Sequence, residues 1–363
     1  PTLNVYSIIT ATVGSGLICI EMTEIIRKER IVWLDYLRLF AIYFVVVSHT
    51  PVSAEFNLPL TYIRMPFFFL CSGLMFNVQR EGTFGEFLKK KARSLLIPFA
   101  TFHIISYPFW LVFDRNFGAD VADAYPWYEP LPDILLGRFA IDDAPLWFLT
   151  ALFCTEIIYF FIAKYLNNKQ ILILLPVLVV IGYLSQAYIS VKLPFMLQTV
   201  AVSIIFYALG NIFQEQIFVL GRKNFIWHCV SLILFGSILY FSSIYNGKIA
   251  MHINQYGNFW FFLPISFIAL LASQSFAVIL EHIFSRRNWI EYISRNLIII
   301  VGLHIMVGKL LKFITLYIFN IPLSVYQDTI IPNLIFSLVS ILLLVPVMMF
   351  VNRFCPKLIG KFK

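Results

Sequence analysis

The amino-acid sequence predicts an all-α, polytopic membrane protein with about ten transmembrane helices and both termini in the cytoplasm. Of its 363 residues, 60% are hydrophobic and 13% are charged, whereas a soluble domain carries roughly 25% charged residues on its water-facing surface. Aromatic residues make up 17% of the chain, which excludes a disordered polypeptide, because such chains are polar and poor in aromatics. The apolar runs are continuous and lack the period-two alternation of a membrane β-barrel.

Ten apolar segments are long enough to cross about 30 Å of hydrocarbon, which takes about 20 helical residues. In chain order they are 31–50, 60–79, 91–113, 145–165, 170–189, 194–213, 224–244, 257–280, 295–319 and 328–351. Even the longest connection, 114–144, is too short for a separate soluble domain. We therefore expect residues 30–363 to form one ten-helix membrane domain.

Positively charged residues set the expected orientation, because Lys and Arg accumulate in cytoplasmic loops. Most of the 27 Lys and Arg residues fall on the side that holds both chain ends. The opposite side has few: Arg64, Arg115, Arg138, Lys192 and Lys248. Membrane orientation thus explains the net charge of +8, and we expect no nucleic-acid partner. The five cysteines are too dispersed for a disulfide framework or a CxxC metal pair, so no metal site is expected.

Residues 1–29 precede the first span and are expected to form an N-terminal extension. The stretch Val5–Ile20 is apolar but too short for a span, and no positively charged region precedes it as in a signal peptide. Met22 begins a polar run that would suit a native start. Our hypothesis is that residues 1–21 are not native.

The first span carries three polar side chains on one face. At about 100° per residue, Arg38 and His49 differ by about 20° around the helix, and Asp35 and His49 by about 40°. A polar stripe on an apolar helix is typical of a side that lines an internal cavity. The alternative is structural: an Asp35–Arg38 pair orients the helix at the membrane boundary, and His49 is an interfacial residue.

Four segments, in order, resemble the acyltransferase-3 family of integral membrane acyltransferases. The run WLDYLRLFAIYFVVVSH (33–49) is similar to the family's opening signature, in which an Arg follows LDxL and a His closes the first helix. The later segments MPFFFLCSGLMF (65–76), LKKKARSLLIPF (88–99) and PLWFLTALF (145–153) are similar to family motifs that begin the next three spans. The resemblance covers residues 30–351.

Two motifs depart from the family pattern. Lys90 and Arg93 hold the positions of an Arg-x-x-Arg motif. A later Tyr-x-x-His element has Val301 in place of its aromatic residue, ahead of His304.

The resemblance implies transfer of an acyl group, usually acetyl, from acyl-CoA to a hydroxyl of a cell-envelope saccharide or lipid-linked glycan. It also implies a multi-pass protein of the bacterial cytoplasmic (inner) membrane, in contact with membrane lipid. Acetyl-CoA is then the donor substrate, no tightly bound cofactor is expected, and a homo-oligomer is left open. The hydroxyl needs a base to remove its proton, and a neutral imidazole suits this role. His49 is the candidate base.

Cationic side chains are candidates for the donor site. Arg38 is expected to orient Asp35 or to bind a donor oxygen, so it joins His49 and Asp35 as a catalytic candidate. Lys90, Lys91 and Arg93 at the cytoplasmic end of the third span are expected to bind the phosphates of CoA. The alternative is that this basic cluster only sets the orientation.

The acceptor candidates are Trp127, Glu156 and His304. Trp127 lies in loop 114–144, where carboxylates and aromatic rings suit a polyhydroxylated acceptor, although the loop can also be merely solvated. For Glu156, the simpler expectation is mutual neutralisation with Lys309 and Lys312 across the helix bundle.

A transporter or flippase for a glycan or lipid-linked substrate is the alternative function, since charges within spans can line an alternating-access pathway. Against it, the sequence has no internal repeat, and spans interrupted by Pro or Gly do not form matched pairs. A sensor or scaffold is a third alternative.

Overall fold

A computed structural model describes residues 30–117, 126–138, 140–141 and 145–362 of the chain. The expected N-terminal extension, residues 1–29, lies outside the described residues. Within the described part the fold is all-α, and its only strand-like pairing is an isolated bridge between Ala250 and Gln255.

The α-helices, in chain order, are α2 (Val32–Ser48), α3 (Ala54–Leu60), α4 (Arg64–Leu74), α5 (Phe84–Lys91), α6 (Ile97–Phe109), α7 (Arg115–Phe117), α8 (Pro130–Leu135), α9 (Trp147–Tyr165), α10 (Asn168–Tyr188), α11 (Leu197–Ile212), α12 (Gln214–Leu220), α13 (Phe225–Asn246), α14 (Phe259–Phe284), α15 (Asn288–Ser294), α16 (Leu297–Tyr317) and α17 (Ile331–Phe354). Short 3₁₀ turns at Val78–Arg80, Pro194–Met196, Met251–Ile253, Leu323–Val325 and Pro356–Ile359 join several of them.

In the described residues, 8 helices are long and apolar enough to cross a membrane. They correspond to the third to tenth predicted spans, which confirms a polytopic, all-α membrane protein. The first predicted span is the 17-residue helix α2. The second differs from the prediction, because it is divided between α3 and the 11-residue α4.

The break between α3 and α4 has a local cause. Pro59 and Pro66 have no backbone N–H to donate to a continuous helix. Between them the chain closes tight turns, with the N–H of Tyr62 donating to Pro59 and that of Ile63 to Leu60. The second crossing therefore includes an irregular turn near Thr61.

The third predicted span is the longest helical unit, running from Phe84 to Asp114. It begins earlier than the sequence predicts because a capping box forms, in which Thr83 and Glu86 satisfy each other's backbone N–H groups. Two π-helical segments, Ala92–Leu96 and Trp110–Asp114, join α5, α6 and α7 without a break.

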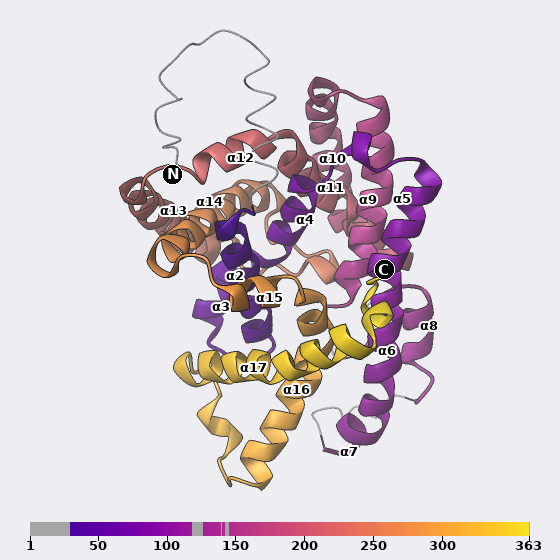
Figure 1. The fold of residues 1–363 in the computed structure, drawn as a ribbon, viewed down its shortest axis with the longest axis vertical. Helices are drawn as coiled ribbons and strands as arrows, with labels where there is room; N and C mark the ends of the chain where they lie inside the picture. The colour runs from indigo at the N-terminus through magenta and orange to yellow at the C-terminus, as the bar shows by residue number, and fades with distance from the viewer. Residues whose placement is uncertain (1–29, 118–125, 139, 142–144, 363) are drawn as a thin grey trace, which may run out of the picture.

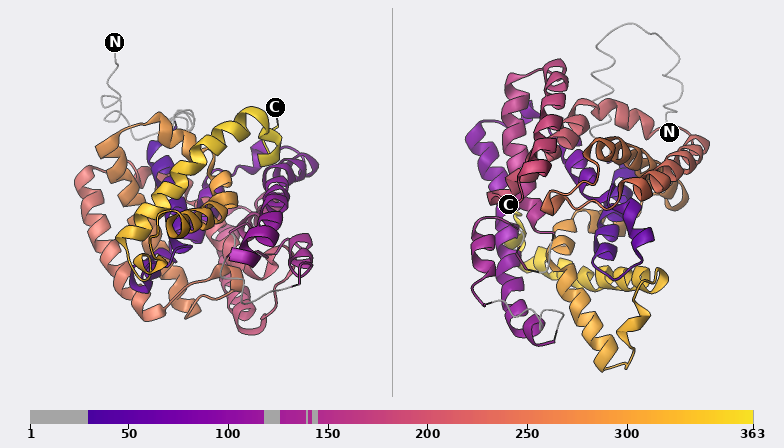
Figure 2. Two further views of the ribbon diagram at one scale, coloured as in Figure 1. Left: turned by 90° about the horizontal axis from the view of Figure 1, so that it is seen from below. Right: turned by 180° about the vertical axis from the view of Figure 1, so that it is seen from behind.

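Helix α2 lies in the middle of the molecule (Figure 1). It packs against α4, α14, α15, α16 and α17. In Figure 1, α13 and α14 lie on one side of it, α5, α6, α9 and α10 on the other, and α16 and α17 below. In the two further views the indigo N-terminal segment, which includes α2, lies next to the orange and yellow helices of the C-terminal half (Figure 2). The candidate catalytic helix is thus an internal element.

Helices α4 and α11 approach closely because glycines lie at their contact. A Cβ atom on Gly73 would collide with the backbone of Tyr207, and one on Gly210 with the backbone of Leu70. Small residues commonly permit such close approach between membrane helices.

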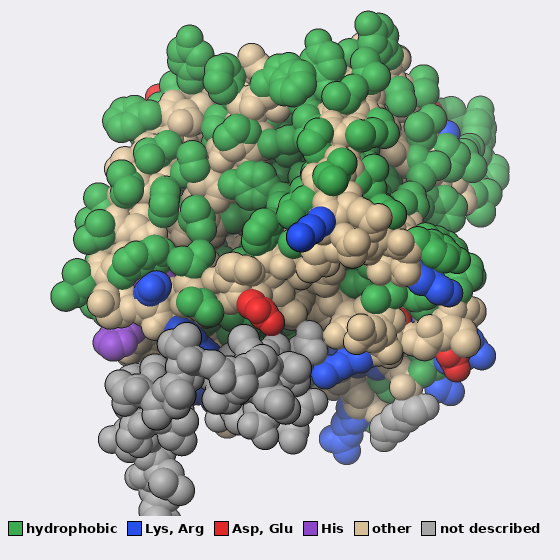
Figure 3. Space-filling view, turned by 90° about the horizontal axis from the view of Figure 1, so that it is seen from above, with side chains coloured by type: hydrophobic (Ala, Val, Ile, Leu, Met, Phe, Trp, Pro, Cys, Tyr) green, Lys and Arg blue, Asp and Glu red, His purple; other side chains and the backbone are tan. Residues whose placement is uncertain are grey.

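The outer surface matches a bilayer environment. Figure 3 shows a side covered by apolar side chains, with Lys and Arg gathered along one edge. Large exposed side chains such as Ile173, Phe241 and Ile331 contribute to the apolar surface of the molecule. In water such an extensive apolar surface would be a liability, whereas lipid tails solvate it.

Candidate active site

His49 ends helix α2 and faces a cavity of about 210 Å³, which we call the His49 cavity. Its backbone N–H donates to the carbonyl oxygen of Val46, and the N–H of Thr50 donates to that of Val47, which fixes the cap residue to the last helical turn. The lining residues come from four parts of the chain: Val45, Ser48, His49, Asn57, Thr61, Arg64, Met65, Pro145, Trp147, Lys248, Ile249, Ala250, Met251 and His252.

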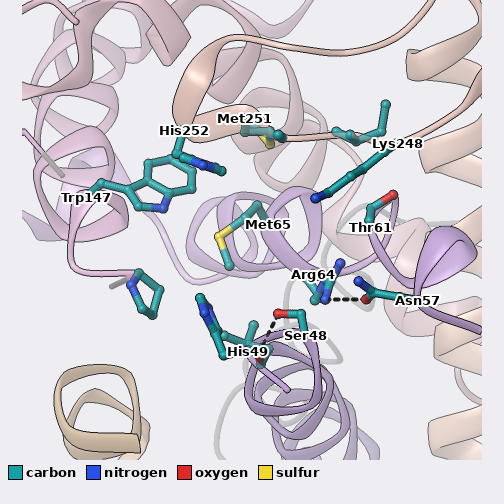
Figure 4. Close-up of a pocket in the computed structure, with 14 residues that line it drawn as sticks. Ser48, His49, Asn57, Thr61, Arg64, Met65, Trp147, Lys248, Met251 and His252 are labelled. Atoms are coloured by element: carbon teal, nitrogen blue, oxygen red, sulfur yellow. Dashed lines mark hydrogen bonds between the residues drawn. The ribbon is translucent and has the colours of Figure 1, made fainter. Parts of the chain in front are cut away.

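Polar hydrogen-bond donors surround the centre of the His49 cavity (Figure 4). Arg64 and Lys248 lie on one side, and Trp147 and His252 lie on the other. Trp147 belongs to the PLWFL segment and is buried at the start of α9. The family-like motifs of the first, second and fourth predicted spans therefore meet at one cavity.

Arg64 is held in place by two neutral acceptors. Its Nη1 donates to the carbonyl oxygen of Phe44 at 3.2 Å and to Oδ1 of Asn57 at 3.0 Å. The residue is only 8% exposed. These contacts tie the beginning of α4 to α2 and leave the positive charge of the guanidinium without a carboxylate in the described residues.

His304 lies beside His49, with the ring centroids 5.1 Å apart. Nδ1 of His304 is 2.6 Å from the carbonyl oxygen of Ile300. If the ring is neutral and donates from Nδ1, Nε2 is left as an acceptor. His49 and His304 also share a smaller cavity of about 60 Å³, lined in part by Lys309 and Lys312.

A second, larger cavity of about 490 Å³ lies at the other end of α2, and we call it the Arg38 cavity. Its lining includes the cations Arg30, Arg38, Arg80, Lys90 and Arg295 and the carboxylates Asp35 and Glu81. Cations therefore predominate in its lining, as a polyanionic ligand requires.

The structure corrects the expected partnership between Asp35 and Arg38. Asp35 accepts hydrogen bonds from Arg30 at 2.5 and 2.8 Å and from the hydroxyl of Ser294 at 2.7 Å. Arg38 donates from Nε to Sγ of Cys71, at 3.2 Å. Asp35 thus anchors the start of α2 to Arg30 and α15, while Arg38 lines the cavity.

The three residues of the basic cluster, Lys90, Lys91 and Arg93, lie in three different environments. Lys90 lines the Arg38 cavity and forms an ion pair with Glu81 at 2.7 Å. Lys91 turns away to Glu156, and Arg93 lies over the ring of Phe362, 4.8 Å from its centroid. Of the three residues expected to bind CoA phosphates, only Lys90 lines the cavity.

The expected neutralisation of Glu156 by Lys309 and Lys312 is wrong. Glu156 is paired with Lys91 at 2.7 Å, and both side chains are largely buried. Lys309 is paired with Asp114 at 2.8 Å, at the end of the long third helical unit. Glu156 therefore has a different cation from those that the sequence predicts, and Lys309 has a partner for which the sequence made no prediction.

The acceptor candidates Trp127, Glu156 and His304 do not lie together at one site. Trp127 is 59% exposed and its backbone carbonyl accepts a hydrogen bond from Tyr107. Trp127 and Glu156 do not line the His49 cavity, whereas His304 touches the ring of His49.

Arg64, Lys248 and His252 line the site although the sequence did not predict them as site residues. Arg64 and Lys248 were counted only as cations of the less basic side. The signal for Arg64 was its position next to Met65-Pro66, at the start of a family-like motif. Lys248 and His252 lie on the connection between α13 and α14, and only the tertiary fold brings that connection to α2.

The two cavities share no lining residue. Arg38 and His49 are eleven positions apart on one helix, or about 16 Å at 1.5 Å per residue. Ala41 and Ile42 lie between them and are fully buried. Chemistry that uses both cavities therefore needs a passage along this part of α2.

Comparison with known proteins gives one finding. The chain matches a family model described as an acyltransferase domain over residues 31–353, which spans α2 to α17 almost completely. No curated protein and no solved structure matches the chain.

Proposed function

Because the chain belongs to the acyltransferase-3 family, we propose that this membrane acyltransferase moves an acetyl group from acetyl-CoA to a hydroxyl of a bacterial cell-envelope saccharide or lipid-linked glycan. The proposed location is the cytoplasmic membrane, with the Arg38 cavity facing the cytoplasm. The observation that carries the proposal is the pair of cavities on one helix. His49 is at one end of α2, and a predominantly cationic cavity is at the other.

His49 acts as the general base in this proposal. A neutral imidazole nitrogen takes the proton of the acceptor hydroxyl, whose oxygen attacks the carbonyl carbon of the thioester. The tetrahedral intermediate then collapses, the carbon–sulfur bond breaks, and the imidazolium returns the proton to the departing CoA thiolate. The products are the O-acetyl ester and CoA, and His49 regains its neutral state.

The Arg38 cavity suits the other end of the donor. The phosphates of CoA are multiply charged, and guanidinium groups bind phosphate oxygens through two parallel hydrogen bonds. Arg38, Arg80 and Lys90 are the lining cations best suited to this role. The lining carboxylates Asp35 and Glu81 already have cationic partners in Arg30 and Lys90.

Direct transfer requires the pantetheine arm to extend from the Arg38 cavity toward His49. Ala41 and Ile42 are fully buried on the part of α2 between the two cavities, so this proposal requires α2 to separate from its neighbours when the donor binds. We prefer this route to a covalent relay, because the proposed chemistry needs no nucleophile besides the acceptor hydroxyl.

The test is transfer of label in membranes that contain the full chain. Radiolabelled acetyl-CoA is supplied to inverted vesicles, and O-acetyl label is measured in the glycan fraction. We expect labelling that falls by about 10²–10⁴-fold in His49→Ala, the range typical of general acid–base groups.

His103→Gln is the control, because His103 is another histidine of a spanning helix; it is buried, and its Nδ1 bonds the carbonyl oxygen of Phe99. It lines neither the His49 cavity nor the Arg38 cavity. Its vesicles should label normally. Equal labelling with His49→Ala, or transport of a glycan without acetyl transfer, would refute the proposal.

A further inference from the structure

The His49 cavity is unusually rich in positive charge for a site that is to bind a sugar. Arg64 and Lys248 line it beside His252, and none of the described residues that line it is an Asp or a Glu. Lys312 adds a further cation in the small cavity on the other face of His49. Neutral sugars are usually bound by carboxylates and amides as well as by donors, so this composition calls for an explanation.

The cations of this cavity differ from other intramembrane cations of the same chain. Lys91 has Glu156 as its partner at 2.7 Å, and Lys309 has Asp114 at 2.8 Å. Among the described residues, Arg64, Lys248 and Lys312 have no carboxylate within ion-pair distance. Within the part of the chain that the structure describes, carboxylates therefore neutralise Lys91 and Lys309, whereas the cations around His49 have no such partner.

An unbalanced buried charge is costly, because burial removes its hydration and no opposite charge compensates for the loss. Arg64 is more than nine-tenths buried, and its two protein contacts are to neutral oxygens. A ligand that brings a negative charge supplies the missing compensation. Lys248 is exposed at the edge of the same cavity and faces it (Figure 4).

We propose that the acceptor is an anionic saccharide, whose carboxylate or phosphate is bound by Arg64 and Lys248 while one of its hydroxyls lies at His49. This inference rests on the proposed function, since it takes His49 as the base. It adds the chemical class of the acceptor, which the family assignment leaves open. A uronic acid and a phosphate-bearing sugar both present a negative charge, so the experiment must separate them.

The experiment measures sugar binding without any acyl donor. Full-length protein in detergent is titrated calorimetrically with methyl glucuronoside and with methyl glucoside, which differ only in the C6 carboxylate. Glucose 1-phosphate is titrated in parallel as the phosphate-bearing sugar. We expect at least one of the two anionic sugars to bind about tenfold or more tightly than the glucoside. The anionic sugar with the higher affinity then identifies the anion that the site prefers. Added salt should weaken the anionic sugar selectively.

Lys248→Gln is the decisive variant, because Lys248 is exposed and makes no ion pair in the described structure. It should lose most of the anion preference and keep the affinity for the glucoside. Lys192→Gln is the matched control, since Lys192 lies outside the cavity and pairs with Asp133 at 3.1 Å. Arg64→Gln is a weaker test, because Arg64 also joins α4 to Phe44 and Asn57.

Equal binding of the glucoside and both anionic sugars would overturn the inference, as would equal behaviour of Lys248→Gln and Lys192→Gln. The proposed function is judged separately by labelled acetyl transfer. Anion-selective binding without transfer would leave the inference standing and refute the acyltransferase proposal for this site. Acetyl transfer to a neutral glycan alone would support the proposed function and overturn the inference of an anionic acceptor.

Discussion

His49 and His304 meet edge to face, with ring centroids 5.1 Å apart and ring planes inclined at 63°. His304 is fully enclosed by α16 and its surroundings, and its Nδ1 is tied to the carbonyl of Ile300 in the preceding turn. The ring of His304 is therefore rigidly placed, and it limits the orientations open to the ring of His49. We interpret His304 as a positioning residue for the proposed base.

Replacement of His304 tests this interpretation. His304→Ala removes the ring contact and opens space beside His49, so we expect kcat for acetyl transfer to fall by about tenfold or more, with the KM for acetyl-CoA nearly unchanged. His304→Phe keeps a ring at the same place and should restore kcat to within about threefold of the parent protein. The measurement is steady-state transfer in vesicles at matched protein levels.

Two outcomes would contradict the positioning role of His304. If His304→Phe were as inactive as His304→Ala, a ring nitrogen rather than the ring contact would be required. If neither variant changed kcat, His49 would not depend on its neighbour.

Arg38 provides a test of the donor cavity. Its Nε donates to Cys71, and the residue lines the Arg38 cavity. Arg38→Lys keeps the charge but loses the planar guanidinium that binds phosphate oxygens in pairs. We expect the KM for acetyl-CoA to rise by about tenfold, with a smaller change in kcat. Initial rates over a range of acetyl-CoA concentrations measure both quantities.

Cys71→Ala is the control for the Arg38 variant, because it removes only the sulfur contact of Nε. It should change the KM for acetyl-CoA by less than about threefold. An unchanged KM in Arg38→Lys would remove Arg38 from the proposed donor site.

The buried pair of Lys91 and Glu156 is expected to support the fold. Its side chains are 17% and 5% exposed, so removing one partner leaves the other charge poorly solvated. Lys91→Met should therefore lower the free energy of unfolding by about 3–5 kcal/mol. Lys91→Met combined with Glu156→Gln should recover much of this loss, because the remaining carboxylate is then replaced by a neutral amide.

Thermal unfolding in detergent measures the effect, and Lys90→Met is the comparison. Lys90 also has a carboxylate partner, Glu81, but its side chain is 61% exposed. An exposed pair contributes about 0–1 kcal/mol, so this variant should unfold near the parent temperature. Equal losses in Lys90→Met and Lys91→Met would show that burial does not decide the strength of these pairs.

The sequence predicted the fold better than it predicted the contacts. Hydropathy located α6, α9, α10, α11, α13, α14, α16 and α17, because lipid imposes length and apolar character on each span separately. Helical periodicity placed Arg38 and His49 on one side of α2, and both do line cavities. The position of a span and the side of a helix on which a residue lies depend on that helix alone, so one sequence is enough to predict them.

Partners on other helices could not be predicted in the same way. Depth in the membrane is encoded locally, but the rotation and neighbours of each helix are set by packing. The sequence-based expectation therefore paired Glu156 with the wrong cations, and it counted Arg64 only as a cation of the less basic side. The short α4 was also missed, since its break depends on how the turn at Thr61 closes.

The approach of α4 to α11 provides the last prediction, because it holds the Arg64-bearing helix in place. A methyl group on Gly73 or on Gly210 would collide with the backbone of the facing helix, and backbone cannot move aside as a side chain can. We expect Gly73→Ala and Gly210→Ala each to destabilise the protein by about 1–3 kcal/mol, the range for overpacked sites.

Gly236→Ala is the matched control, since Gly236 lies within α13 with open space around its Cβ position. There the substitution should be neutral or stabilise by up to about 1 kcal/mol, through the higher helix propensity of Ala. Thermal unfolding of the three variants in one detergent decides the question. Equal stability of Gly73→Ala and Gly236→Ala would mean that α4 and α11 are not in close backbone contact.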